Sequence, residues 1–97
     1  FNIPRDKRMA CLDACKVKTP LEVRLWKNGD RFVPLGMKGK KLVSDYLTDR
    51  KFSLFQKERQ CVACCEGQIV WLVGERIDQR FAITPVTTQA WIITIKE

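Results

Sequence analysis

The 97-residue sequence contains no histidine. Histidine is the commonest metal ligand and a frequent general base, so its absence removes most Ser-His and Cys-His nucleophile schemes. The P-loop, the G-x-G-x-x-G motif and the H-E-x-x-H motif are also missing, and no two carboxylates are placed for acid–base catalysis. We therefore expect a binding module with no catalytic residue, rather than a self-contained hydrolase.

Long apolar runs are missing as well. The stretch from Ile69 to Val73 has only five residues, whereas a membrane-spanning helix needs about 20, and the opening residues do not form a secretory signal. We expect no membrane contact and a cytoplasmic location. Because the chain starts at Phe1 and is short for a domain, we expect a single domain cut from a longer protein, with a lead-in segment at 1–19 and a core at 20–97.

Cysteine is present in an odd number, five, which does not suit a disulfide scaffold. Cys61, Cys64 and Cys65 have the spacing of a metal knuckle, but the pair Cys11 and Cys15 does not. Within a strand, Cys64 and Cys65 would point to opposite faces, and buried free cysteine is common in cores. We favour packing of reduced thiols, and a zinc module that binds proteins remains an alternative.

Acidic residues are too few to balance the basic ones, and the net charge is +7. The whole excess lies in residues 1–60, because residues 61–97 carry three cations and four acids. This distribution predicts that the middle third meets an acidic partner such as nucleic acid, while the C-terminal third is mainly structural.

The hydrophobic pattern predicts an α+β fold. Alternation in residues 21–26 indicates a strand that buries Leu21, Val23 and Leu25, and Asn28-Gly29 predicts a turn into a short returning strand at 31–33. Helical spacing follows at 42–48, and Ser53 with Gln56 forms a capping box for a second helix. Strands are expected at 60–65, 69–73 and 91–95, with Glu66-Gly67 as a turn. We expect the three tryptophans, Trp26, Trp71 and Trp91, to pack in the core or cover an edge rather than stack on bases.

The most informative stretch is the basic loop from Lys27 to Lys41. Gly36 and Gly39 allow backbone amides to approach a phosphate, and Lys38, Lys40 and Lys41 supply positive charge. A solvated loop that only aids solubility would have the same composition. From the residues alone, both interpretations stay open.

The remaining cations have structural explanations. Arg50 and Lys51 follow the first helix, where cations complement the helix dipole. Arg76 and Arg80 each lie two residues from Asp78, which favours ion pairs within a turn.

Two longer motifs resemble a known family. The first is GDRFVPLGMKGKKL with Ser44-Asp45-Tyr46, and the second runs from Ile69-Val70-Trp71 through Gly74 and Arg76-Ile77-Asp78 to Arg80-Phe81. Upstream, Leu12-Asp13-Ala14 and the stretch from Pro20 to Trp26 are similar to the lead-in of the same family. In this order, the motifs resemble the C-terminal domain of tRNA(Ile)-lysidine synthetase, and the resemblance covers nearly the whole chain.

The resemblance implies a small sheet sandwich with short helices, similar to a domain of the phenylalanyl-tRNA synthetase β chain. It implies a bacterial, cytoplasmic parent that uses ATP to attach lysine to the wobble cytidine of an isoleucine tRNA. That chemistry belongs to an N-terminal catalytic domain absent from this chain, so ATP is expected in the parent and no cofactor or metal here. The expected partners are the acceptor stem of the tRNA and the catalytic domain, with no DNA.

The resemblance also favours phosphate contacts over mere solubility for the basic loop. An alternative from the residues is a stand-alone basic RNA-binding module. The predicted nucleic-acid-binding residues are Arg31, Lys38, Lys40, Lys41, Arg50, Lys51, Arg76 and Arg80.

Overall fold

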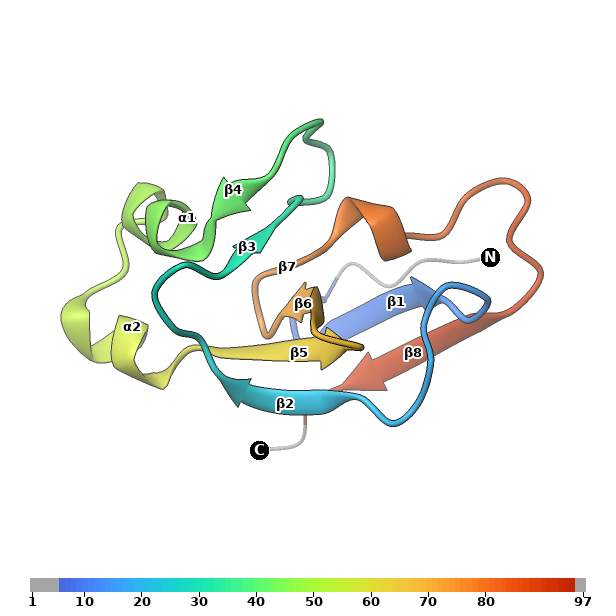
Figure 1. Cartoon of the computed structure of the whole chain (residues 1–97), viewed down its shortest axis with the longest axis horizontal. Helices are drawn as coiled ribbons and strands as arrows, with labels where there is room; N and C mark the ends of the chain where they lie inside the picture. Colours follow the sequence, from blue (N-terminus) through green and yellow to red (C-terminus); the bar gives the residue numbers. More distant parts are fainter. Residues whose placement is uncertain (1–5, 96–97) are drawn as a thin grey trace.

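A hairpin of strands β5 (Cys61–Cys65) and β6 (Gln68–Leu72) forms the centre of the computed structural model, which describes residues 6–95 (Figure 1). Its turn has positive φ at both Glu66 (51°) and Gly67 (81°), as a two-residue turn that matches strand twist requires. Strands β2 (Glu22–Leu25) and β7 (Arg76–Ile77) extend the hairpin into an antiparallel sheet with the order β2-β5-β6-β7. The predicted hairpin and its turn are confirmed.

Side chains along β5 point alternately to the two sides of the central hairpin and take part in two hydrophobic cores. Ala63 and Cys65 belong to what we call the β1-side cluster, and Val62 and Cys64 to the α1-side cluster. The predicted divergence of Cys64 and Cys65 is therefore confirmed. The full β1-side cluster is Ala10, Leu12, Val17, Ala63, Cys65, Val70, Trp71 and Phe81. The α1-side cluster is Phe32, Val43, Tyr46, Leu47, Val62, Cys64, Ile69 and Leu72.

The β1-side cluster is shared with a two-stranded ladder, β1 (Met9–Asp13) with β8 (Ala90–Thr94). The sequence pattern predicted β8 but no strand in the lead-in segment. Ala10 and Leu12 of β1 are fully buried, so the hydrophobic core begins before residue 20. A 3₁₀ turn, η1 (Gln79–Phe81), precedes the connection to β8.

The α1-side cluster is covered by a second small unit. Strands β3 (Arg31–Phe32) and β4 (Lys41–Leu42) pair antiparallel, and helix α1 (Val43–Asp49) follows β4 directly. As the helical spacing predicted, α1 buries its apolar side, and the Phe32 and Tyr46 rings meet edge to face at 5.4 Å. Helix α2 (Leu54–Arg59) has the predicted capping box, but it buries no residue.

Two details of the predicted strands are wrong. The short strand at Arg31–Phe32 pairs with β4 and not with β2. The face of β2 that was expected to be buried is open, since the side chains of Val23 and Leu25 are 64% and 58% exposed. The physical reason is that β2 is an edge strand of its sheet, and no described part of the chain covers its Val23 and Leu25 side chains. In the described part of the chain, no helix is long and apolar enough to cross a membrane.

Candidate nucleic-acid interface

The connection between β3 and β4, residues 33–40, is held at its base by the segment 77–79. The Gln79 amide donates to the Val33 carbonyl at 2.7 Å and the Leu35 amide to the Ile77 carbonyl at 3.0 Å. The Gln79 side chain accepts from the Gly36 amide at 2.8 Å. Gly36 has φ of 89°, a conformation that glycine adopts without steric cost. The glycine-rich loop is thus anchored to a stretch more than 40 residues later.

Asp78 is the buried centre of this anchor. Its carboxylate is fully inaccessible and accepts from the Val33 amide at 2.8 Å, the Arg80 amide at 2.8 Å and two Arg80 guanidinium nitrogens at 3.0 and 2.9 Å. The hydrogen bonds between the guanidinium and the Asp78 carboxylate raise the pKa of Arg80. The predicted pairing of Asp78 with Arg80 is confirmed. The predicted pairing with Arg76 is not seen, because Arg76 lies over the Tyr46 ring, 5.6 Å from its centre.

Two hollows open next to the anchored loop. The first hollow lies beside α1 and is lined by Arg31, Lys40, Lys41, Leu42, Asp45, Thr48 and Asp49. The second hollow is lined by Arg24, Gly29, Asp30, Arg31, Lys40, Gly67, Gln68, Ile69 and Arg80. We call the two hollows and the connection between β3 and β4 the basic surface. Arg31 and Lys40 are at its centre, because they border both hollows.

Some cations of this surface are already neutralised. Lys41 donates to Asp49, and Arg80 is held by Asp78. Within residues 6–95, no acidic side chain forms an ion pair with Arg31, Lys38 or Lys40. All three are exposed. Their charge is therefore free to meet a ligand.

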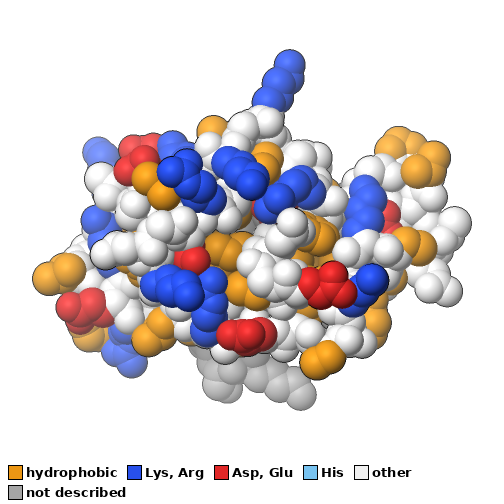
Figure 2. Space-filling model, in the orientation of Figure 1, with side chains coloured by type: hydrophobic (Ala, Val, Ile, Leu, Met, Phe, Trp, Pro, Cys, Tyr) orange, Lys and Arg blue, Asp and Glu red, His pale blue; other side chains and the backbone are white. Residues whose placement is uncertain are grey.

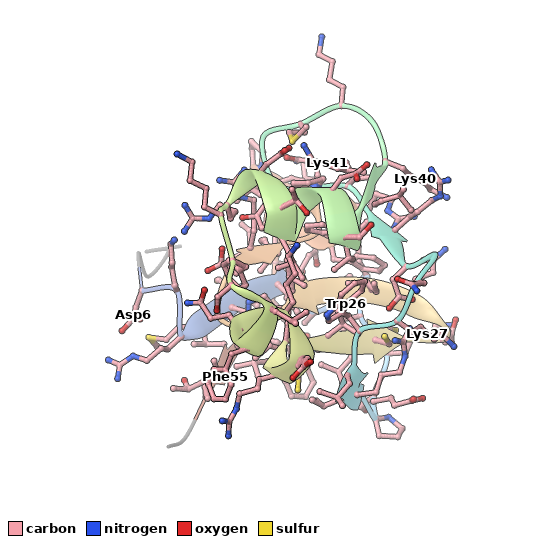
Figure 3. All side chains as sticks on the ribbon, turned by 90° about the vertical axis from the view of Figure 1, so that its left-hand side faces the viewer. Asp6, Trp26, Lys27, Lys40, Lys41 and Phe55 are labelled. Atoms are coloured by element: carbon pink, nitrogen blue, oxygen red, sulfur yellow. The ribbon has the colours of Figure 1, made fainter. Side chains whose placement is uncertain are left out.

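Figure 2 shows Lys and Arg side chains gathered along the upper part of the molecule, over the connection between β3 and β4. The view in Figure 3 places Lys40 and Lys41 at this same edge, above Trp26 and at the end opposite Phe55 of α2. The indole nitrogen of Trp26 donates to the Lys57 carbonyl at 2.6 Å, and Trp71 is buried in the β1-side cluster. These two tryptophans pack within the fold, as predicted, while Trp91 is 45% exposed on β8.

Arg24 belongs to the second hollow, and sequence reasoning missed it. Its guanidinium forms two hydrogen bonds with the Asp30 carboxylate, at 2.9 and 3.0 Å. Burial alone would raise the pKa of Asp30, but Arg24 and the backbone amide of Lys27 outweigh burial and hold this pKa below its usual value. The turn at Asn28-Gly29 brings the two residues together. The sequence predicts this turn, but it does not show that Arg24 and Asp30 meet across it.

Gln68 is the other missed residue of the second hollow. It opens β6 directly after the Glu66-Gly67 turn, and its side chain is exposed. A single polar residue after a turn gives no sequence signal for a site. Only the arrangement of the two sheets brings it next to Arg31 and Lys40.

Four predicted residues, Lys38, Arg50, Lys51 and Arg76, line neither hollow. Arg50 caps α1 and donates to Glu75 at 2.9 Å, and this bond raises the pKa of Arg50. Lys51 follows at φ of 60° and is exposed. Lys38 lies on the connection between β3 and β4, whereas Arg50, Lys51 and Arg76 form a separate basic group beside α1.

The five cysteines are free. Burial raises the pKa of Cys64 despite the nearby Arg24 guanidinium, and the Cys65 sulfur accepts from the Lys18 amide at 3.2 Å. Among residues 6–95, no group of three or more His, Cys, Asp or Glu side chains is placed to hold a metal ion.

Known proteins with similar sequences identify the family to which this chain is similar. Residues 21–93 match the family described as TilS substrate C-terminal domain. The tRNA(Ile)-lysidine synthase of Bacteroides thetaiotaomicron is 55% identical over 95 residues, which cover 98% of this chain and 22% of that protein. The protein of the same name from Parabacteroides distasonis is 50% identical over 93 residues, 96% of this chain and 21% of its own length. The chain thus spans about a fifth of these relatives.

Two solved structures share the fold. The crystal structure of a TilS C-terminal domain has a TM-score of 0.79 at 20% identity and covers all of this chain and 78% of its own. An N-terminal fragment of the phenylalanyl-tRNA synthetase β-subunit from Pyrococcus horikoshii has a TM-score of 0.73 at 17% identity, over 87% of this chain and 26% of its own. The fold expected from the sequence motifs, with its likeness to both domains, is confirmed.

Proposed function

Since the chain belongs to the TilS substrate C-terminal domain family, we propose that it is the tRNA-binding domain of a bacterial, cytoplasmic tRNA(Ile)-lysidine synthase. The parent enzyme would use ATP to attach lysine to the wobble cytidine of an isoleucine tRNA. The reaction and the ATP site would lie in an N-terminal catalytic domain. This chain would hold the acceptor stem and carry no catalytic residue.

The observation that carries the proposal is the set of unneutralised cations on an anchored loop. Arg31, Lys38 and Lys40 are exposed and have no ion-pair partner within residues 6–95. Arg31 lies on β3, and the connection that bears Lys38 and Lys40 is fixed by Asp78 and Gln79. Phosphate contacts supply most of the affinity of nucleic-acid binding and set the orientation of the complex. A double-stranded RNA stem hides its major groove and offers phosphates and 2′-hydroxyls, which suit such a surface.

The predicted residues take graded roles in this proposal. Arg31, Lys38 and Lys40 contact phosphates directly. Lys41 and Arg80 contribute while paired with Asp49 and Asp78, which orient them. Arg50, Lys51 and Arg76 contact the RNA only where a stem extends along α1.

Titration with three RNAs tests the proposal. The chain is titrated with the complete isoleucine tRNA, its isolated acceptor stem and its isolated anticodon arm, each at two salt concentrations. We expect the acceptor stem to bind nearly as well as the complete tRNA, with affinity that falls steeply as salt rises. Equal affinity for the anticodon arm, or no binding to any of the three, would contradict the proposal.

A pair of charge reversals locates the surface. Arg31→Glu with Lys40→Glu should lower acceptor-stem affinity on the order of 100-fold, because two phosphate contacts become repulsive. The matched control is Lys18→Glu with Arg59→Glu, which makes the same change of net charge outside both hollows. The control should lose far less affinity. An equal loss in both variants would mean that only the overall charge matters.

A further inference from the structure

The second hollow differs from the rest of the basic surface because an uncharged amide takes part in it. Arg31 comes from β3 and Lys40 from the last position before β4, whereas Gln68 comes from the start of β6 in the four-stranded sheet. The Gln68 side chain is exposed, and within residues 6–95 it accepts or donates no hydrogen bond. Its donor and acceptor atoms are therefore available to a ligand.

The charge balance of this hollow limits what it can bind. Arg24 is neutralised by Asp30, and Arg80 is neutralised by Asp78. Arg31 and Lys40 remain as free positive charges next to a neutral amide. The hollow therefore suits a ligand with an anionic group and an uncharged hydroxyl or amide close to it.

The hollow is also open at its edge, so a unit of a longer strand can reach it. Gly29 and Gly67 both border it, and a Cβ atom added to either would meet nothing within 4 Å. The backbone thus leaves open room beside Gln68. Along an RNA strand, each phosphate is followed by a ribose whose 2′-hydroxyl both donates and accepts hydrogen bonds, whereas DNA lacks this group. A glutamine amide can also do both.

We propose that the second hollow binds a ribose-phosphate unit of the RNA backbone, with Arg31 and Lys40 at the phosphate and Gln68 hydrogen-bonded to the 2′-hydroxyl. Gln68 is then the residue by which the domain distinguishes RNA from DNA. This inference rests on the proposed function, because it names what one part of that surface recognises.

The experiment combines single 2′-deoxy substitutions in the acceptor stem with Gln68→Leu. Each 2′-deoxy position removes one hydroxyl and keeps the phosphate. We expect one position at which the unaltered chain loses affinity by about 5- to 10-fold, the loss typical of one hydrogen bond. Gln68→Leu should lose a similar factor with the all-RNA stem and should no longer respond to that 2′-deoxy position.

Gln89→Leu is the matched control, since Gln89 is exposed and lies outside the second hollow. It should respond to the 2′-deoxy stems like the unaltered chain. Circular dichroism checks that both variants fold, so that a general loss of structure is distinguished from a lost contact.

Two results overturn the inference while the proposed function stands: no 2′-deoxy position matters, or Gln68→Leu keeps the full response. If the unaltered chain fails to bind the all-RNA stem, both the inference and the proposed function fail.

Discussion

Asp30 is the residue whose charge links pH to the stability of the basic surface. Its carboxylate is nearly inaccessible, with a side-chain exposure of 8%, and it accepts from Arg24 and from the Lys27 amide. Its backbone carbonyl accepts from the Val43 amide at 2.9 Å, where α1 begins. One acidic residue therefore ties β2, the following turn and α1 together.

The lowered pKa of Asp30 predicts a loss of stability in acid. A group whose pKa is lower in the folded state stabilises the fold above its unfolded pKa, about 3.9 for aspartate, and this stabilisation is lost as the pH falls through the folded pKa. Asp30→Asn should therefore be less stable than the unaltered chain at pH 7, by about 2 kcal/mol. Its stability should also change less between pH 5 and pH 2, measured by urea unfolding.

Asp6→Asn is the control for this prediction. Hydrogen bonds with Arg8 also lower the pKa of Asp6, but the residue is exposed. The variant should be nearly as stable as the unaltered chain at pH 7. If Asp30→Asn kept the full pH dependence, another group would have to be responsible.

Local chemistry at single residues was predictable, but contacts across turns were not. The Asp78–Arg80 pair followed from a spacing of two residues. The Arg24–Asp30 pair depends on how the turn at Gly29 redirects the chain, which the residue types alone do not specify. For the same reason Gln68 could not be assigned to the second hollow from the sequence.

At the level of elements, the end of a helix was predicted more accurately than the side of a strand that is buried. The capping box at Ser53 is present because its hydrogen bonds join residues three apart, and the Ser53 hydroxyl accepts from the Gln56 amide at 3.2 Å. The alternation in β2 was read correctly as a strand, but it did not show whether anything covers the apolar side. Burial of a strand depends on a neighbour that local sequence does not describe.

Ser53→Ala should lower the free energy of unfolding by about 1 kcal/mol, the usual value of a lost N-cap. Helix α2 buries no residue, so little else holds its first turn. Urea unfolding measures the effect. Ser44→Ala is the matched control, because Ser44 is inside α1 and no capping bond involves its hydroxyl. A larger loss in the control than in Ser53→Ala would refute the role of the cap.

For the whole molecule, the central hairpin joins the two hydrophobic cores. Val62 and Cys64 face α1, while Ala63 and Cys65 face the β1–β8 ladder. Neither core can lose its packing without exposing a face of the same two strands. The basic surface and the ladder should therefore unfold together.

This arrangement predicts a single unfolding transition. Leu47→Ala removes a fully buried side chain from the α1-side cluster and should cost about 3 kcal/mol. The unfolding curve from tryptophan fluorescence, to which the buried Trp71 of the β1-side cluster contributes, should shift together with the curve from circular dichroism. Two separate midpoints in the variant would show that the cores unfold independently.

At the scale of the whole molecule, the sequence could not show which residues far apart along the chain contact one another. The hydrophobic pattern and the order of the motifs were sufficient to predict the fold class, and the charge map pointed to the basic loop. The contacts between Val33 and Asp78, 45 residues apart, and the pairing of Met9 with Thr94 are visible only in three dimensions. The strand in the lead-in segment was missed for this reason, since its partner lies at the other end of the chain.

The β1–β8 ladder also brings the first and the last strand of the described chain together. The antiparallel register pairs Met9 with Thr94, so the start of β1 and the end of β8 lie at the same end of the ladder. Arg31 of β3 and Lys40 of the following connection belong to neither strand of that ladder (Figure 1). Substitutions in the ladder can therefore alter how the first and last strands are paired without changing a residue of the basic surface.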